Sequence, residues 1–348
     1  MILKINPIKP ELDKIRMAAN AIREGKLAVF PTETVYGLGA NALDDEACKR
    51  IFLTKGRPQD NPLIVHVSSI EMAEKLAEIP KEYLQKIRQA WPSPITFIVK
   101  KKNILPNSVT AGLETVALRM PAHPIALELI KEAGLPIAAP SANLSGKPSP
   151  TEASSVIEDF GDRIDIIIDG GPTFFGLEST VIDLETFTIA RPGPFTIEEI
   201  TKIFGKIPKI FKQTKEIAKP MSPGMKYRHY APSKPLFLFS GDNESFVNIA
   251  NNLGKSFCFI ASNEICGRIY NEKAVKIRLG SSKNLYEIAK NLFSSLRAID
   301  KLEPNFAICE SFEEKGIGLA IMNRLHKACG GAIFADENRL KKFITAIK

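Results

Sequence analysis

The sequence predicts an α/β protein in which a twisted, open mixed sheet with helices is followed by a long linker and then a smaller parallel α/β domain. Three observations predict this architecture. Helical and strand patterns mix irregularly in the first half, the composition changes sharply after residue 207, and strands and helices alternate in the second half. We therefore expect domains at 1–207 and 235–348, joined by a linker at 208–234.

The first domain is expected to combine helices and buried strands. Residues 10–24 carry apolar side chains at helical spacing and begin with a proline, which predicts an amphipathic helix. Short β-branched runs predict buried strands, and their irregular order favours a mixed sheet. The expected helices are 10–24, 44–53, 71–77 and 124–133, and the expected strands are 27–30, 63–67, 96–99, 116–120, 136–139, 164–168 and 180–184.

The segment 208–234 has the composition of a linker. It holds seven basic residues and one acid, Glu216, and it is rich in proline. Its second part, 221–232, is dense in tyrosine, histidine, arginine and proline, which a plain tether does not need. A connection of this length without secondary structure is uncommon unless it is disordered or works as a lid.

The second domain shows the clearer pattern. Strands are expected at 236–239, 257–261, 274–279 and 306–310. A helix is expected at 284–302, where the apolar residues share one face. This alternation predicts a parallel, Rossmann-like α/β domain with right-handed crossovers.

Composition and charge exclude several classes of protein. The five cysteines are scattered, no apolar run is long enough to cross a membrane, and the N-terminus does not resemble a signal peptide, so we expect a cytoplasmic protein without disulfides. Residues 1–207 contain 24 basic and 26 acidic residues, whereas residues 208–348 contain 23 and 13. The basic second half could attract nucleotide phosphates or tRNA, or it could simply be a solvated surface.

Familiar catalytic motifs are missing. The chain has no GxxxxGK[ST] phosphate loop, no HExxH and no GxSxG, and its four histidines are too widely spaced to predict a metal site. The segment 37–42 fits GxGxxA, but polar residues precede it where a dinucleotide fold needs a buried strand. An oxidoreductase is therefore a poor interpretation.

Polar residues gather instead at the ends of the expected strands. His66 in an apolar strand is more often a core histidine than a ligand. Arg119 in the run Val116–Met120 must meet an anion, and a structural ion pair and a ligand carboxylate are equally good interpretations.

Taken together, these segments resemble one family, the threonylcarbamoyl-AMP synthases with a YrdC-like domain. The resemblance covers the whole chain, because the run 222–232 and the following α/β domain are similar to the two-domain form of that family. The segments that carry it in the first domain are Pro31–Gly39, Lys55–Pro58, Asn61–His66, Leu118–Pro121, Ala139–Asn143 and Ser179–Asp183.

The resemblance implies an enzyme that joins L-threonine, bicarbonate and ATP into threonylcarbamoyl-AMP, with release of pyrophosphate, for tRNA modification. It implies that the catalytic residues are Lys55 and Arg57. The residues it implies for L-threonine are Thr34, His66, Arg119, Ala139 and Ser179. Those implied for ATP are Lys55, Arg57, Asn61, Thr115, Ser141, Ser149, Arg191 and Tyr230.

The same resemblance implies Mg²⁺ bound with ATP, held mainly by substrate oxygens and water, and no metal ligands from the protein. The dense aromatic and basic composition of 221–232 predicts that 208–234 closes over the nucleotide as a lid, and the alternative is that these side chains only dock the two domains. The resemblance leaves open whether tRNA or the downstream threonylcarbamoyl transferase binds this chain. A nucleic-acid-binding module is the alternative class, because YrdC-like folds resemble RNA-binding surfaces and the second half is basic.

Overall fold

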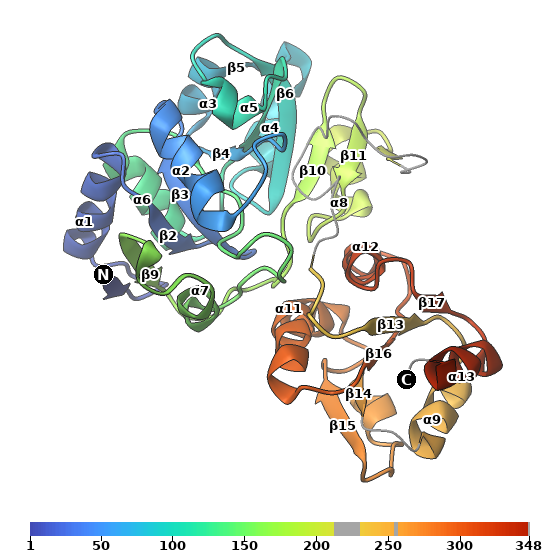
Figure 1. Cartoon of the computed structure of the whole chain (residues 1–348). Coiled ribbons are helices and arrows are strands. Elements are labelled where there is room, and N and C mark those ends of the chain that lie inside the picture. Colours follow the sequence, from blue (N-terminus) through green and yellow to red (C-terminus); the bar gives the residue numbers. More distant parts are fainter. Residues whose placement is uncertain (212–229, 254–256, 347–348) are drawn as a thin grey trace. The chain divides into compact units, whose positions relative to one another are not determined.

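The computed structural model describes residues 1–211, 230–253 and 257–346 (Figure 1). Contacts divide the chain into two compact units: the first unit comprises residues 1–145 and 149–227, and the second unit comprises 146–148 and 228–348. Most of the expected linker, and with it the expected lid, lies outside the described residues. The boundaries 1–207, 208–234 and 235–348 stay predictions.

The first unit contains a mixed sheet, as the sequence predicts. Parallel and antiparallel pairs alternate irregularly along it, with β6 and β7 antiparallel and β4 and β7 parallel. The strand order is β1 (Ile2–Lys4), β9 (Ile166–Asp169), β2 (Ala28–Pro31), β3 (Tyr36–Asn41), β8 (Ile137–Ala138), β4 (Ile64–His66), β7 (Thr115–Arg119), β6 (Ile95–Lys101), β10 (Thr180–Asp183), β11 (Thr188–Arg191) and β12 (Lys209–Ile210), and β5 (Ala77–Glu78) pairs with β6.

Helices cover the two faces of this sheet unequally. One face packs against α2 (Asp45–Lys55), α3 (Ile70–Leu76), α4 (Lys81–Ala90), α7 (Ala153–Phe160) and α8 (Ile197–Phe204) in the largest core cluster. On the other face, α1 (Leu12–Arg23) and α6 (Pro124–Ala133) form a second core cluster with β1, β2, β8 and β9 (Figure 1). Two short turns complete the unit, α5 (Asn107–Thr110) and the 3₁₀ turn Gly161–Arg163.

The segment that resembles a dinucleotide-binding loop is a strand. Gly37 and Gly39 lie in β3, which pairs antiparallel with β2. A Cβ atom on Gly39 would lie 2.7 Å from the Phe30 ring and 2.8 Å from Ile137, so this glycine allows close packing. The structure thus confirms that the GxGxxA match does not indicate a phosphate-binding turn.

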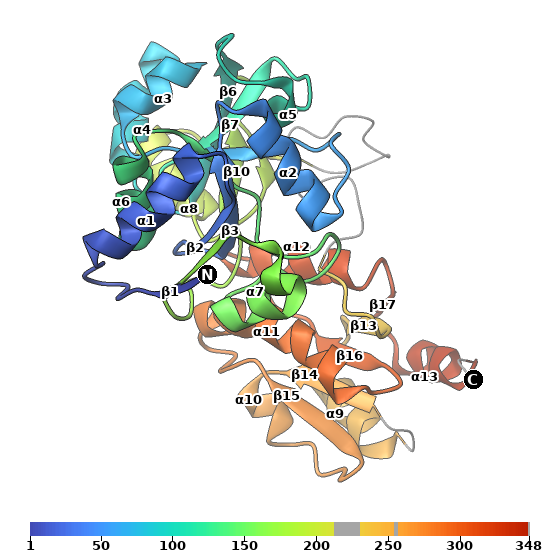
Figure 2. The ribbon, with the colours of Figure 1, turned by 60° about the vertical axis from the view of Figure 1, so that its left-hand side comes forward.

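The second unit contains a parallel sheet, which confirms the predicted fold class. Its order is β15 (Ala274–Arg278), β14 (Phe257–Ala261), β16 (Ala307–Glu310), β13 (Leu236–Phe239) and β17 (Ile333–Phe334). In Figure 2, α11 (Leu285–Leu302) and α12 (Gly318–Ala328) lie on one side of this sheet, and α9 (Asn243–Asn252) and α10 (Asn263–Cys266) lie on the other. The core on the α9 side also includes α13 (Glu337–Ala346).

Candidate functional site

The candidate site lies on one face of four neighbouring strands, β4, β7, β6 and β10. Successive side chains of a strand point to opposite faces. Every second residue of these strands enters the largest core cluster, for example Val65, Leu118 and Phe97. The residues between them face the other way and form a small apolar cluster of Ile64, Ile98, Ala117 and Val181. We call this second surface the site face.

Strand register places the polar residues of the site face in one row. His66 on β4 pairs with Arg119 on β7, and Arg119 pairs with Thr96 on β6. Thr96 in turn pairs with Val181 on β10, and Ser179 lies two residues before Val181. His66, Arg119, Thr96 and Ser179 are all buried. Predicted threonine-site residues from three separate sequence segments therefore meet at one end of the site face.

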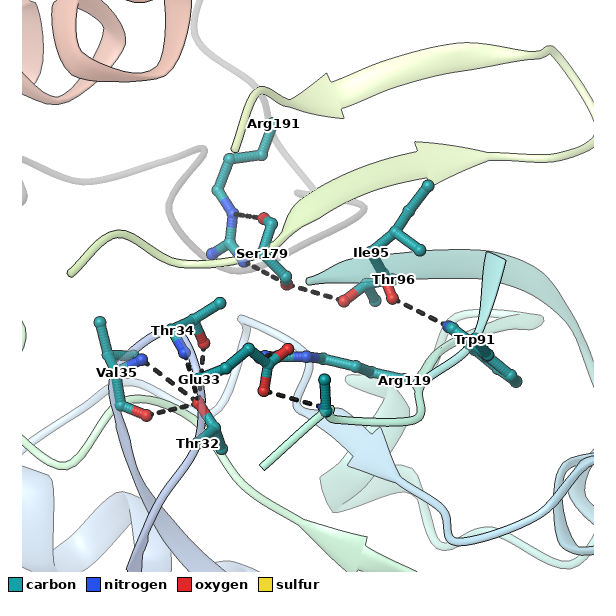
Figure 3. A network of polar contacts seen from close by, with 11 residues as sticks. Thr32, Glu33, Thr34, Val35, Trp91, Ile95, Thr96, Arg119, Ser179 and Arg191 are labelled. Carbon is teal, nitrogen blue, oxygen red and sulfur yellow. Dashed lines mark hydrogen bonds and ion pairs between the residues drawn. The ribbon is translucent and has the colours of Figure 1, made fainter. Parts of the chain in front are cut away.

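Arg119 lies beside the Glu33 carboxylate, as Figure 3 shows. Its Nη2 lies 2.7 Å from Glu33 Oε1, and both side chains are buried. The second oxygen, Glu33 Oε2, accepts a hydrogen bond of 3.0 Å from the backbone N–H of Ala122. Arg119 Nε is also buried, and it has no partner among the described residues. Arg119 thus forms an ion pair and still presents an unpaired donor.

His66 is neutral at ordinary pH. Burial, and then the positive charge of Arg119, lower its pKa to about 3. Its Nδ1 is buried and has no hydrogen-bond partner among the described residues. The ring of Phe30 packs edge-on against the imidazole, with ring centroids 6.1 Å apart. The sequence favoured a satisfied core histidine, but an unpaired buried nitrogen beside Arg119 points to a ligand instead.

Hydroxyl groups complete this end of the site face. Thr34 follows β2 in a tight turn, and its Oγ1 lies 2.8 Å from Thr32 Oγ1. Ser179 Oγ lies 2.8 Å from Thr96 Oγ1 and accepts a hydrogen bond of 3.2 Å from Arg191 Nη2. Arg191 Nε also donates to the Ser179 carbonyl at 3.1 Å. Figure 3 shows these contacts as a chain from β11 to β6.

Ala139 enters the site through its backbone. It directly follows β8, and its N–H donates to the Ile64 carbonyl at 2.9 Å. Its Cβ would lie 3.3 Å from a Cβ built on Gly37, so the small side chain lets β3 and β8 approach each other.

The two basic residues predicted to be catalytic lie at the end of α2. Gly56 ends this helix in the left-handed conformation, with φ of 60°, and so separates Lys55 from Arg57 by a sharp turn. Lys55 Nζ donates to the carbonyls of Ser141 and Asn143, both at 2.5 Å. Arg57 Nη2 donates to the Asn61 carbonyl at 3.2 Å. Both cations support the loops that carry Ser141 and Asn61, and their predicted role at phosphates stays a prediction.

Among the residues predicted to bind ATP, Asn61 shows the strongest sign of a missing hydrogen-bond partner. Its side chain is buried, yet neither Oδ1 nor Nδ2 has a partner among the described residues. A buried amide with both atoms unpaired is costly, so a ligand group or water should satisfy it. Two other predicted nucleotide residues have protein partners: Ser141 Oγ donates to Asn143 Oδ1 at 2.5 Å, and Ser149 Oγ donates to Glu178 Oε1 at 2.6 Å.

Thr115 begins β7 and shares the site face with Arg119. They are four positions apart, which corresponds to about 13 Å along a strand. Thr115 also lines a cavity of about 600 Å³, together with Lys100, Asp183 and Glu185. Glu78 and Glu82 line the same cavity, so acidic residues outnumber basic ones there and a triphosphate would be repelled. Thr115 therefore suits an uncharged part of a nucleotide.

Tyr230 belongs to the second unit. Its ring stacks on Phe293 of α11, with centroids 5.1 Å apart, and the guanidinium of Arg324 of α12 lies 5.8 Å from its ring centroid. Its backbone has a φ of 65°, which is uncommon for a residue other than glycine. Its predicted contact with ATP stays a prediction.

Comparisons with known proteins identify the family. A family model described as "Telomere recombination" matches residues 20–193, and one described as "Threonylcarbamoyl-AMP synthase, C-terminal domain" matches residues 195–330. The threonylcarbamoyl-AMP synthase of Pyrococcus abyssi is 50% identical over 330 residues, covering 91% of this chain and 94% of that protein. The chain belongs to the threonylcarbamoyl-AMP synthase family.

Further relatives agree with this assignment. The threonylcarbamoyl-AMP synthase of Bacillus subtilis is 46% identical, covering 92% of this chain and 94% of its own length. The crystal structure of the P. abyssi Sua5 protein complexed with L-threonine matches with a TM-score of 0.90 and 47% identity, covering 97% of this chain and 99% of that one. Like its relatives, the chain is an enzyme of a family that uses ATP.

Neither a cluster of metal-binding side chains nor a membrane-spanning helix occurs in the part of the chain that the structure describes. No group of three or more histidine, cysteine, aspartate or glutamate side chains could hold a metal ion there. No helix of that part is long and apolar enough to cross a membrane.

Sequence reasoning assigned no role to three buried residues of the site. Thr32 and Glu33 belong to a polar run, and Thr96 belongs to the expected strand 96–99, but neither pattern predicts a role for them. A signal for Glu33 did exist, because a buried arginine needs a counter-ion and Glu33 is an acid within a segment that carries the resemblance.

Proposed function

We propose that this chain catalyses the reaction of its family: L-threonine, bicarbonate and ATP give threonylcarbamoyl-AMP and pyrophosphate, for N6-threonylcarbamoyladenosine formation in tRNA. One observation carries the proposal for the site. A buried arginine with an unpaired Nε and a neutral histidine with an unpaired Nδ1 occupy adjacent strands on the same face of the sheet. The P. abyssi relative, whose structure this chain resembles, was crystallised with L-threonine.

The row of buried polar residues supports a threonine site. The fork of Arg119 suits the threonine carboxylate. Neutral His66 can exchange a hydrogen bond with the amino acid without repelling its ammonium group, because it carries no charge. Thr34 and Ser179 are fully buried and offer hydroxyl groups that can bond the threonine side chain. Bicarbonate and the amino group then form a carbamate next to Arg119.

The distance between Arg119 and Thr115 supports an extended adenylate on the site face. A span of about 13 Å along β7 accommodates an amino acid at one end and a nucleoside at the other. Asn61 lies three residues before β4, whose Ile64 pairs with Ala117 of the adjacent β7. The α-phosphate would lie between the two ends of this span, where Lys55, Arg57 and Arg191 can neutralise its charge.

The chemistry asks little covalent work of the protein. A carbamate oxygen attacks the α-phosphorus of ATP, the bond to the bridging oxygen breaks, and pyrophosphate leaves with that electron pair. Positioning and charge neutralisation contribute most in such transfers. Lys55 and Arg57 contribute through the loops they hold and through their charge.

Magnesium enters this proposal as part of the substrate, MgATP. Such an ion would be held mainly by phosphate oxygens and water. A direct contact with tRNA, or with the downstream threonylcarbamoyl transferase, is a further proposal that rests on the basic second half. The cytoplasmic location stays a prediction from the sequence.

Mass spectrometry tests the proposal directly. The protein is mixed with MgATP, L-threonine and ¹³C-bicarbonate, and the products are analysed for threonylcarbamoyl-AMP that carries the label. The labelled adenylate should appear only when all three substrates are present. An Arg119→Ala variant should give far less of it. Formation of AMP and pyrophosphate without labelled adenylate would contradict the proposal.

A further inference from the structure

Glu33 makes three contacts that tie the candidate threonine site together. Its Oε1 pairs with Arg119 Nη2 at 2.7 Å, and its Oε2 accepts from the N–H of Ala122 at 3.0 Å. Its own carbonyl accepts a hydrogen bond of 2.9 Å from the N–H of Phe175. Arg119 and Ala122 belong to β7 and the loop directly after it, and Phe175 belongs to the loop before β10, so Glu33 connects its own turn to two other segments far apart in sequence.

The ion pair between Glu33 and Arg119 neutralises a buried positive charge. A buried guanidinium without a counter-ion is strongly unfavourable. The side chains of Arg119 and Glu33 are 4% and 8% exposed, so both charges of this ion pair are buried. The Glu33 carboxylate therefore balances the charge of Arg119 when no substrate carboxylate is present.

We propose that Glu33 is the positioning residue of the threonine site: it fixes the direction of the Arg119 guanidinium and sets the charge of the site. This inference rests on the proposed function, in which Arg119 binds the threonine carboxylate. Because Glu33 takes only Nη2, the buried Nε of Arg119 remains for the ligand. Glu33 also directly precedes Thr34, so the same turn supplies a ligand hydroxyl and the residue that orients the arginine.

The charge balance determines which form of ligand is accepted. Arg119 and Glu33 balance each other and His66 is neutral, so these three side chains together carry no net charge. A zwitterion such as threonine matches that balance, since its ammonium is attracted by Glu33 while its carboxylate pairs with Arg119. A plain anion such as 3-hydroxybutanoate, which is threonine without its amino group, is repelled by Glu33 and gains nothing in return.

The test uses the full-length protein with Glu33→Gln, which keeps the shape and removes the charge. Threonine affinity, measured by calorimetry in the presence of a non-hydrolysable ATP analogue, should fall by about tenfold or more. Affinity for the ATP analogue should stay within about twofold, since Glu33 bonds none of the predicted nucleotide residues. The preference for threonine over 3-hydroxybutanoate should fall as well, because the site now carries a positive charge.

A matched control separates this role from a general loss of stability. Glu310 of the second unit is also buried, and its Oε2 accepts from the backbone N–H of Ser262 at 2.7 Å and from the Ser262 hydroxyl at 2.8 Å. Glu310→Gln should lower the melting temperature and leave threonine affinity unchanged. Should Glu33→Gln fail to fold, Glu33→Asp keeps the charge but withdraws the carboxylate by one methylene, and it should weaken threonine binding through the lost direction alone.

A double-mutant cycle with Arg119→Lys shows whether Glu33 acts through Arg119. The combined variant should lose less affinity for threonine than the sum of the two single losses, because the orientation of a fork no longer matters once the fork is gone. Additive losses, or equal losses of threonine and ATP affinity, overturn the proposal for Glu33. If Arg119→Lys itself binds threonine normally, the threonine site is misassigned and both proposals fail; if only Glu33→Gln binds normally, the function stands and Glu33 has no positioning role.

Discussion

At the scale of single residues, the site is built from polar groups that the protein buries without fully satisfying. Asn61, His66 and Arg119 each keep at least one buried polar atom that has no partner in the described part of the chain. Such atoms cost free energy in the empty protein, about 1–3 kcal/mol for a neutral group. A substrate that forms hydrogen bonds with these atoms removes that cost, and this gain contributes to its binding free energy.

Substrate choice is the first prediction at this scale. Valine fits the space of threonine but lacks the hydroxyl, and it would leave the buried hydroxyls of Thr34 and Ser179 without a ligand partner. We expect kcat/KM for valine to be lower by about a hundredfold or more, and for serine, which lacks only a methyl group, by about tenfold. Pyrophosphate release measured with each amino acid tests this prediction, and equal rates for valine and threonine would contradict it.

The neutral state of His66 gives a second prediction, about stability. Its pKa is about 3 in the folded protein, against a reference value of 6.5. Between these pH values the unfolded chain binds more protons, so His66 makes the free energy of unfolding fall as the pH falls, by at most about 1.4 kcal/mol per pH unit. The full stabilisation is present only above pH 6.5 or so, and it is lost as the pH approaches 3.

Urea unfolding of the native protein and His66→Asn between pH 4.5 and 7.5 measures this effect. The variant lacks the titrating group, so its stability should depend less steeply on pH by up to one proton. His123, whose pKa is also lowered by burial, is present in both proteins and cancels in the comparison. Parallel pH curves for the two proteins would show that His66 does not titrate between the folded and unfolded states as described.

At the scale of elements, strand alternation explains why one face of the sheet is core and the other is a site. The same five residues of β7 supply Val116 and Leu118 to the core and Thr115, Ala117 and Arg119 to the site face. Because α1 and α6 cover the second face only near β1, β2, β8 and β9, the part at β4, β7, β6 and β10 is left to the ligand residues. A one-residue slip of β7 would move Arg119 into the core.

The close packing of β3 predicts that alanine destabilises the protein more at Gly39 than at Gly37. Gly39→Ala would place a methyl group 2.7 Å from Phe30 and 2.8 Å from Ile137, which overpacks the sheet. We expect a loss of about 1–3 kcal/mol in the free energy of unfolding. Gly37→Ala meets its nearest neighbour, Ala139 Cβ, at 3.3 Å and should cost less. Equal melting temperatures for the two variants would contradict the packing role of Gly39.

At the scale of the whole molecule, local patterns predicted the elements, and long-range contacts decided what the residues do. The helix at 124–133 and the parallel sheet of the second unit follow from periodicity and are confirmed. β3 was not predicted as a strand, because its glycines and the polar run before it suggest a loop. The Glu33–Arg119 pair joins residues 86 positions apart, and no spacing rule reveals such a contact.

The same limit applies to the role of the second unit. The sequence places a lid in 208–234, most of which lies outside the described residues. The structure connects the second unit with the loop between Ser141 and Ser149. Residues 146–148 of this loop group with the second unit rather than with the first. The Pro148 carbonyl accepts from Arg297 Nη2 at 2.6 Å, and the Gly146 carbonyl accepts from Ala231 N–H at 3.2 Å.

Removal of residues 208–348 should therefore affect the two substrates differently. The core clusters of the first unit consist of residues up to Phe204, so the shortened protein should fold and melt cooperatively. All the residues proposed for threonine remain, and its affinity should change by no more than a few-fold. The loop between Ser141 and Ser149 loses its anchors, and Tyr230 is lost, so ATP affinity and adenylate formation should fall by about tenfold or more.

Calorimetry for each substrate, together with the labelled-adenylate assay, checks this on the full-length and shortened proteins. Arg297→Ala in the full chain is the matched variant, since it removes one anchor of Pro148 and keeps the rest of the second unit. It should reproduce part of the loss for ATP and none for threonine. If the shortened protein makes the adenylate at the full rate, neither the lid nor the anchored loop contributes to catalysis, and 208–234 is only a connector.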